Sequence, residues 1–350
     1  MDKIIKKKLC EIEKAWKERD LLKLKELCVA PNGLISNDYR KQIWPLLLEI
    51  DNISDFMANW KDIDLSNSYS DIIQRDIDRS LYNFDICESY NEEIRKNLRI
   101  ELSNIVNGVI KHNPDLHYFQ GFHSICSTFL LIGGEDLGFK MSSQCALLHI
   151  KDSMRKSFED SVYPEMMLIY KLLRIQNSKL AKKLESVYTF DTDLNSPMFS
   201  LSWILTWLSH NIVNFNTLCR VFDFMLGTHP LAPVYITSAI ILTQKKEILS
   251  FESMPDVHQH FSDLVDKLDM EAICADAFNM MLRVPPENLV RASERKFPED
   301  SALKGEVKVA RRYQKKQRAI QIMMSTIFVF LVIIISFLVN RYNVIGLIKG

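Results

Sequence analysis

Three residues spaced three positions apart form a group that could orient a cationic side chain. Ile73, Asp76 and Arg79 occur in the string IQRDIDR. On a helix these positions follow one another along one side, so the Asp76 carboxylate can hold the Arg79 guanidinium by a charge-assisted hydrogen bond. Pairs of this kind are also common on exposed helices, where each contributes only about 0.3–0.5 kcal/mol. Taken alone, the string favours an ordinary surface ion pair.

A second candidate is the glutamine of the string YFQG at residues 118–121. Gln120 follows the turn HNPD at residues 112–115 and stands beside aromatic residues, so its amide could point into a cleft. The alternative is a residue at a helix start that satisfies nearby backbone groups. Taken alone, the string favours that plainer interpretation.

Other arrangements of reactive residues carry less. His258 with His260, and His117 with His123 and Cys126, do not supply four ligands at ordinary zinc spacing, so no metal site is expected. The serine-nucleophile string GxSxG and the phosphate-binding string GxxxxGK[ST] do not occur in the sequence. We therefore expect no nucleotide-binding element in this chain.

The composition predicts that helices position these residues. The 350 residues include only 10 Gly and 11 Pro, while 47% are hydrophobic, which disfavours a fold of many strands and turns. Seven scattered cysteines without a C-x-x-C pair indicate a reducing compartment. Helical periodicity and turn signals predict helices at about 2–29, 36–50, 89–112, 116–134, 138–157, 163–174, 178–187, 199–213, 215–226, 231–247 and 262–282.

The C-terminal part differs from the rest in charge and hydropathy. From Lys304 onward there are nine basic residues and one acidic residue, a net charge of +8, so the preceding body carries −8. Residues 319–339 contain no charged residue and are long enough to cross the hydrocarbon core of about 30 Å as one helix. The sequence therefore predicts a single transmembrane helix there.

Basic residues set the predicted orientation of this helix. Five of them lie between residues 311 and 318, whereas only Arg341 follows closely on the other side. The N-terminal body is therefore expected in the cytosol, and the tail at 340–350 in the lumen. Attraction of residues 311–318 to anionic lipid, about 1 kcal/mol per basic residue, accounts for the basic stretch more simply than a nucleic-acid partner.

The two strings in this order resemble the TBC domain of Rab GTPase-activating proteins. That family has an I-x-x-D-x-x-R string followed about forty residues later by Y-x-Q. Three further blocks are similar to other parts of the domain: RKQIWPLL (40–47), FSLSWILTWL (199–208) and RVFDFML (220–226). The resemblance covers about residues 30–290.

The resemblance implies an all-α, two-lobed TBC domain followed by the predicted transmembrane helix. The expected parts are an N-terminal helical segment (1–29), the TBC domain (30–290) with both strings in its N-terminal lobe (about 30–190) and a C-terminal lobe (about 195–290), a basic linker (291–318), the transmembrane helix (319–339) and the lumenal tail (340–350).

The resemblance also implies what the strings do. Arg79 is expected to act as an arginine finger, oriented by Asp76, on the GTP-bound state of a Rab. Gln120 is expected to act as a glutamine finger that takes over water positioning from the glutamine of the GTPase, with Tyr118 fixing its loop. GTP and Mg²⁺ belong to the Rab, so no cofactor is expected in this chain. We expect an activator that acts in trans and is not itself an enzyme.

Other positions of the family pattern are either matched or altered. Ile73 and Gly121 match it and are expected to support the two fingers. His123 replaces the commoner Asn or Ser, Ser124 stands where many members have an acidic residue, and Phe222 replaces a Trp. These departures leave both fingers in place.

Two hypotheses follow from the resemblance. The first is a Rab GTPase activator at the endoplasmic reticulum or an early secretory membrane that regulates traffic to the Golgi, because the chain is most similar to a membrane-anchored member of the family. The second is a catalytically inactive, membrane-anchored protein that binds a Rab as a tether. The presence of both finger residues favours the first hypothesis.

Overall fold

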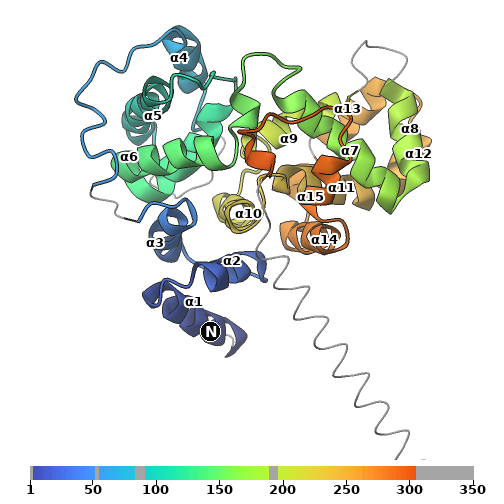
Figure 1. The fold of residues 1–350 in the computed structure, drawn as a ribbon, viewed down its shortest axis with the longest axis horizontal. Helices are drawn as coiled ribbons and strands as arrows, with labels where there is room; N and C mark the ends of the chain where they lie inside the picture. The colour runs from blue at the N-terminus through green and yellow to red at the C-terminus, as the bar shows by residue number, and fades with distance from the viewer. Residues whose placement is uncertain (1–2, 52–54, 83–90, 189–195, 263, 305–350) are drawn as a thin grey trace, which may run out of the picture. The chain divides into compact units, whose positions relative to one another are not determined.

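A computed structural model describes residues 3–51, 55–82, 91–188, 196–262 and 264–304 of the chain (Figure 1). Residues Met1–Val307 form one compact unit. The prediction of an all-α fold is confirmed, because the described residues form helices and turns and contain no strand. The predicted division into lobes at about 190–195 stays a prediction.

Fifteen α-helices and four short 3₁₀ helices occur in the described residues. The α-helices are α1 (Lys3–Lys17), α2 (Leu21–Val29), α3 (Asn37–Leu47), α4 (Ser70–Asp78), α5 (Glu92–His112), α6 (Phe122–Leu148), α7 (Val162–Gln176), α8 (Ser178–Tyr188), α9 (Leu201–Thr206), α10 (Phe215–Gly227), α11 (Ala232–Thr243), α12 (Lys245–Ser250), α13 (Met254–Ser262), α14 (Met270–Arg283) and α15 (Pro286–Arg291). The 3₁₀ helices are η1 (Asp152–Met154), η2 (Met198–Ser200), η3 (Val265–Lys267) and η4 (Ala302–Lys304).

Polar side chains fix several helix starts. The Ser36 hydroxyl accepts a hydrogen bond from the backbone N–H of Tyr39 at the start of α3. Asn91 does the same for the N–H of Ile94 at the start of α5. Caps of this type contribute about 1 kcal/mol each. The sequence therefore sets where these helices begin, including α5, which packs against α4.

The helices that carry the two strings are neighbours. Figure 1 shows α4, α5 and α6 grouped at one end of the unit and α8, α12 and α13 at the other, with α9 and α10 between them. The hairpin of α5 and α6 packs tightly, α4 lies on α5, and α6 also contacts α9. This packing brings the end of α4, the start of α6 and α9 into one region.

A buried carboxylate joins the first helices to α10. Asp223 accepts hydrogen bonds from the Arg40 guanidinium, the indole N–H of Trp44 and the backbone N–H of Leu34. Removing one partner of a buried ion pair typically costs about 3–5 kcal/mol. Next to it, the Phe222 ring lies 5.9 Å from Trp44 between ring centroids. Phe222, the residue that replaces the family Trp, is thus part of a fully buried aromatic cluster.

Two helix predictions can be compared with the structure in detail. The segments 116–134 and 138–157 were expected to be separate helices, and Gly134, with φ 76° and ψ −180°, is non-helical and divides α6 at the predicted place. The outer ends differ from the prediction, because α6 begins at Phe122 and ends at Leu148. The apolar run at 231–242 forms the buried helix α11, as predicted.

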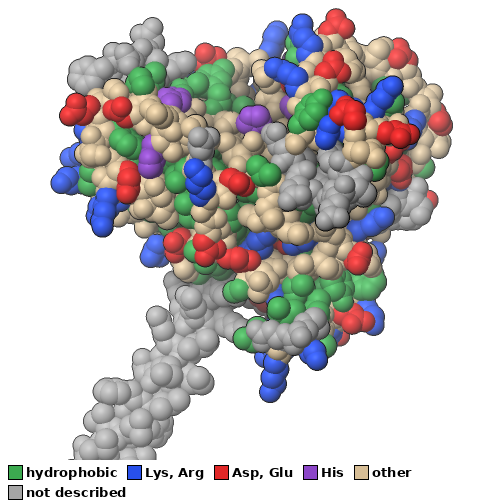
Figure 2. All heavy atoms as spheres, turned by 180° about the vertical axis from the view of Figure 1, so that it is seen from behind, with side chains coloured by type: hydrophobic (Ala, Val, Ile, Leu, Met, Phe, Trp, Pro, Cys, Tyr) green, Lys and Arg blue, Asp and Glu red, His purple; other side chains and the backbone are tan. Residues whose placement is uncertain are grey.

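The packed body extends past residue 291, where the basic linker was predicted to start. Phe297 and Leu303 are buried, and Asp300 makes ion pairs with Lys151 and Arg155. A few apolar side chains and one acidic residue hold this otherwise polar stretch against the helices. Figure 2 shows acidic and basic side chains intermixed over one face of the unit, an arrangement that permits many such pairs.

The predicted membrane segments cannot be located in the structure. The lipid-contacting residues 311–318, the span 319–339 and the tail 340–350 all lie outside the described residues. Within the described ranges, no helix combines the length and the apolar character needed to cross a bilayer.

Candidate functional site

The structure forms the ion pair expected from the first string. Helix α4 ends at Asp78, and Arg79 caps its C-terminal end. The Arg79 Nη2 donates to Asp76 Oδ1 at 2.8 Å, and its Nε donates to the carbonyl of Arg75 at 3.2 Å. The Asp76 side chain is 3% exposed, whereas that of Arg79 is 69% exposed. A buried carboxylate therefore holds an arginine that remains accessible to a partner.

The second string meets the same carboxylate. The Tyr118 hydroxyl donates to Asp76 Oδ2 at 2.7 Å, so the two oxygens of Asp76 serve one string each. Burial raises the pKa of Tyr118, and the hydrogen bond to Asp76 raises it further. The phenol therefore keeps its proton and its role as donor. Asp76 joins the end of α4 to the loop that precedes α6.

His123 extends this network from the first turn of α6. Its Nδ1 lies 3.3 Å from the Tyr118 hydroxyl and 3.6 Å from Asp76 Oδ2. Burial lowers the pKa of His123 to about 4, against the opposing effect of Asp76, so the ring is neutral at pH 7. Because the Tyr118 hydroxyl donates its hydrogen bond to Asp76, its oxygen is free to accept one, and the arrangement fits a proton on Nδ1 of His123, with Nε2 accepting from the Ser124 hydroxyl at 3.3 Å.

A glycine turns the chain between Gln120 and α6. Gly121 has φ 112°, in the region that favours glycine, and a Cβ atom there would lie 2.9 Å from Cγ2 of Thr206. The close approach of α9 thus adds to the need for glycine at this position. Gln120 is exposed, and no described residue hydrogen-bonds its side-chain amide. Its amide is available for a water or a ligand.

Arg79 and Gln120 line one cleft with a volume of about 610 Å³. Three segments form its walls: the end of α4, the start of α6, and α9 with the turn after it. The lining residues are Asp76, Arg79, Ser80, Leu81, Gln120, Gly121, His123, Ser124, Ser127, Leu201, Ser202, Leu205, Thr206, Ser209 and His210. The sequence-predicted pair therefore faces a common space.

Arg75, the other arginine of the first string, lies outside the cleft. Its side chain is exposed, but unlike Arg79 it does not line the cleft. Ile73, on the inner side of α4, is fully buried. In the first string, then, the apolar residue anchors the helix, Asp76 is its buried acceptor, and only Arg79 reaches the cleft.

Sequence reasoning missed the third wall of the cleft. Ser202 and Thr206 come from the block at 199–208, noted only for its similarity to the TBC domain, and Ser209 and His210 follow it. Trp203 and Trp207 of the same block are buried. The available signal was a polar row spaced three or four residues apart in an otherwise apolar helix, which marks one polar face.

The histidine groups weighed as metal sites have other partners. The His117 ring nitrogen Nδ1 lies 2.6 Å from the Tyr69 hydroxyl, and His260 pairs with the Gln244 amide. No group of His, Cys, Asp or Glu in the described residues is arranged to hold a metal ion.

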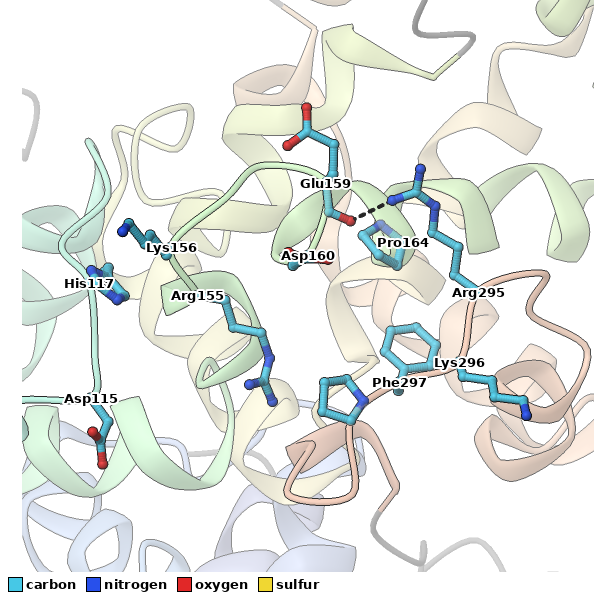
Figure 3. Close-up of a pocket in the computed structure, with 11 residues that line it drawn as sticks. Asp115, His117, Arg155, Lys156, Glu159, Asp160, Pro164, Arg295, Lys296 and Phe297 are labelled. Atoms are coloured by element: carbon cyan, nitrogen blue, oxygen red, sulfur yellow. Dashed lines mark hydrogen bonds between the residues drawn. The ribbon is translucent and has the colours of Figure 1, made fainter.

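A second cavity of about 390 Å³ is lined in part by Asp115 and His117, which precede the YFQG string (Figure 3). Its labelled side chains come from the segment before α6, the loop before α7, the first turn of α7 and residues 295–297. Arg295 donates to the backbone carbonyl of Glu159, the contact drawn in Figure 3. Of the residues weighed above, only His117 lines this cavity, so it does not assemble the predicted site.

Comparison with known proteins identifies the family. The sequence model of the Rab-GTPase-TBC domain matches residues 37–249, more than half of the chain and including both strings. The chain belongs to the Rab-GTPase-TBC domain family. This TBC protein is therefore a Rab GTPase-activating protein, and its family implies a Rab GTPase as partner.

Individual relatives agree with this assignment. TBC1 domain family member 20 of Mus musculus is 30% identical over 290 residues, which cover 82% of this chain and 70% of that protein. The GTPase-activating protein gyp10 of Schizosaccharomyces pombe is 25% identical over 249 residues, which cover 71% of this chain and 64% of that protein. The crystal structure of the Ypt/Rab-GAP domain of Gyp1p has a TM-score of 0.61 at 13% identity, covering 81% of this chain and all 100% of that one, and it shows the same fold.

One expectation was wrong. The chain was expected not to be an enzyme, on the ground that the nucleotide belongs to its partner. Its family consists of GTPase activators, and gyp10 is named as one. A GTPase activator is a catalyst, because it accelerates GTP hydrolysis in each partner molecule that it meets. The location of the nucleotide on another protein does not change this.

Proposed function

We propose that this TBC protein accelerates GTP hydrolysis by a Rab through Arg79 and Gln120, inserted together into the nucleotide site of the partner. The observation that carries the proposal is that both side chains are exposed and line the same cleft. Asp76, which holds Arg79, is buried. An exposed cation with a buried orienting carboxylate is suited to meeting phosphate charge on another protein.

The two side chains match the two demands of the reaction. Water attacks the γ-phosphorus of GTP, the bond from that phosphorus to the β–γ bridging oxygen breaks, and GDP leaves with the electron pair while the proton of the water passes to the phosphate. Arg79 would neutralise charge on the transferred group and the leaving oxygen. An arginine finger contributes about 10³–10⁵ in rate, or roughly 4–7 kcal/mol of barrier. The Gln120 amide would orient the water.

The contacts around Asp76 would make the cleft ready before the partner binds. Preorganised charges stabilise a transition state without reorganising during the reaction. Asp76 would hold Arg79 in direction, and Tyr118 would fix the loop that carries Gln120. Ile73 and Gly121 would support these positions, the first by burial and the second by its backbone conformation. The reaction would use the GTP and Mg²⁺ of the Rab, with no cofactor in this chain.

We also propose a location for this activity. An uncharged run at 319–339 flanked by basic residues 311–318 is typical of a tail anchor with the domain in the cytosol. Residues 311–318 would lie against anionic lipid, and residues 340–350 in the lumen. The membrane would be the endoplasmic reticulum or an early secretory membrane, where the protein would regulate traffic to the Golgi.

Single-turnover GTP hydrolysis by a panel of GTP-loaded Rabs tests the catalytic proposal. With a Rab that the full-length protein activates, Arg79→Ala is expected to lower the activated rate by about 10³-fold or more, and Gln120→Ala by about 10²-fold.

Arg75→Ala is the matched control, because it removes the same charge four residues earlier on α4 without changing the cleft lining. It is expected to leave the rate unchanged. The proposal fails if Arg79→Ala and Gln120→Ala activate as well as the wild type while Arg75→Ala does not.

A further inference from the structure

The backbone that follows Arg79 adopts a conformation that needs outside support. Arg79 caps the C-terminal end of α4, and two residues later Leu81 has φ 64°, in the left-handed region that is unfavourable for a residue with a Cβ. Leu81 is buried, and both Ser80 and Leu81 line the cleft. The position of Arg79 therefore depends on what holds residues 80–82.

Two arginines of α5 hold this segment by its carbonyl groups. Arg99 donates from Nε and Nη2 to the Ser80 carbonyl at 3.3 and 3.1 Å. Arg95, one helical turn earlier, donates from Nε to the Leu81 carbonyl at 3.2 Å. Because the bonds go to the carbonyl oxygens of two successive peptide groups, before and after Leu81, they fix the path of the chain directly.

The same two arginines also contact the ring of the next residue, Tyr82. The guanidinium carbons of Arg95 and Arg99 lie 4.5 and 4.4 Å from the centroid of the Tyr82 ring, within the range of cation–π attraction. Their side chains are only 17% and 16% exposed. We call Tyr82, Arg95 and Arg99 the arginine–tyrosine clamp.

Helix stability does not explain these arginines. Arg95 is the fourth residue of α5 and Arg99 the eighth, so both lie beyond the first turn, to which the effect of the helix dipole is largely confined. Glu92 pairs with both side chains. A planar guanidinium can donate in its plane while stacking on a ring, which a lysine ammonium cannot do. The contacts to residues 80–82 account for arginine at both positions.

We propose that the arginine–tyrosine clamp is a positioning device for Arg79. By fixing the Ser80 and Leu81 carbonyls, it would hold the end of α4 at the distance from Gln120 that the reaction needs. This inference rests on the proposed role of Arg79, which the same experiment tests separately. The competing use of these residues is direct contact with the GTPase, because Tyr82 is 54% exposed.

Steady-state kinetics of the full-length protein, with GTP-loaded Rab as the varied substrate, separate the two uses. The double variant Arg95→Met/Arg99→Met keeps much of the apolar stem and removes the donors. It is expected to lower kcat by about 10–100-fold, because misplacing a catalytic group by about 1 Å costs up to about 10²-fold. The KM for the Rab is expected to change by less than about threefold, because the free protein and its complex with the Rab lose the same internal contacts.

Replacement by lysine separates geometry from charge. Arg95→Lys/Arg99→Lys keeps both positive charges and is expected to remain at least about tenfold below wild type in kcat. Lys96→Met is the matched control, because Lys96 is an exposed cation on the same helix, and it is expected to leave kcat and KM unchanged. If the double methionine variant does not fold, Tyr82→Leu is expected to lower kcat severalfold on its own.

Three results would overturn the proposed role of the clamp. The first is an unchanged kcat in the folded double methionine variant or in Tyr82→Leu, the second is a raised KM with an unchanged kcat, and the third is full activity of the double lysine variant. Arg79→Ala in the same assay distinguishes the failures: if it is inactive while the clamp variants are active, only the clamp is wrong. If Arg79→Ala is fully active, the proposed function itself fails.

Discussion

At the scale of residues, the candidate site depends on the carboxylate of Asp76. One of its oxygens accepts a hydrogen bond from the Arg79 guanidinium, and the other accepts one from the Tyr118 hydroxyl. Because Asp76 is almost fully buried, water does not readily replace a lost partner, and an unsatisfied buried acceptor is expensive. Loss of the Tyr118 hydroxyl should therefore also alter how Asp76 holds Arg79.

Tyr118→Phe tests this link. The substitution removes one hydrogen bond to a charged group, which is expected to lower the free energy of unfolding by about 1.5–3 kcal/mol. It is also expected to lower the activated hydrolysis rate by about tenfold, since Arg79 and the Gln120 loop lose a common anchor. Urea denaturation measures the first effect and single-turnover hydrolysis the second.

Tyr235→Phe is the control for a purely structural loss. The hydroxyl of Tyr235, in α11, donates to the carbonyl of Val284, after α14, at 2.6 Å, and neither residue lines the cleft. This variant is expected to lose stability and keep its rate. Equal rates in both variants would show that the Tyr118 hydroxyl serves the fold alone.

At the scale of elements, the sequence predicted what is local. The spacing of Asp76 and Arg79 predicted their ion pair, because both lie within one turn of a helix end. The approach of Thr206 to Gly121 could not be predicted, because it depends on how α9 packs against α6, across 85 residues of chain. The arginine–tyrosine clamp likewise exists only once α5 lies against α4.

Element boundaries depended on contacts that single-sequence patterns do not contain. The pair Gly133 and Gly134 correctly predicted a break, since Gly134 is non-helical, but the pattern placed the end of the second half at 157, whereas α6 ends at Leu148. The polar run after residue 291 suggested a linker. The isolated apolar residues Phe297 and Leu303 were enough, with Asp300, to hold it on the body.

At the scale of the whole molecule, the proposed activity and the proposed anchor occupy different parts of the chain. The compact unit ends at Val307, before the uncharged run at 319–339. The acidic body with net charge −8 and the basic stretch beyond it suit a domain that works on a protein while its C-terminal flank lies on anionic lipid.

Deletion of residues 319–350 tests this separation. The shortened protein is expected to leave the membrane fraction on carbonate extraction, because it lacks the predicted transmembrane segment at 319–339. It is expected to activate a soluble Rab at the same rate as the full chain, since no cleft residue is removed. Retention of the shortened protein in the carbonate-resistant membrane fraction would contradict the anchor.

The central claim is that this protein supplies its own glutamine together with its arginine, and hydrolysis by a Rab that lacks its catalytic glutamine tests it most directly. The measurement is single-turnover hydrolysis by an activated Rab whose glutamine has been replaced by leucine. The wild-type protein is expected to raise the hydrolysis rate of this Rab to within about tenfold of the activated rate of the unaltered Rab. Gln120→Ala is expected to give no acceleration of hydrolysis by the altered Rab. If the wild-type protein fails to accelerate the altered Rab, Gln120 does not position the water and the account is contradicted.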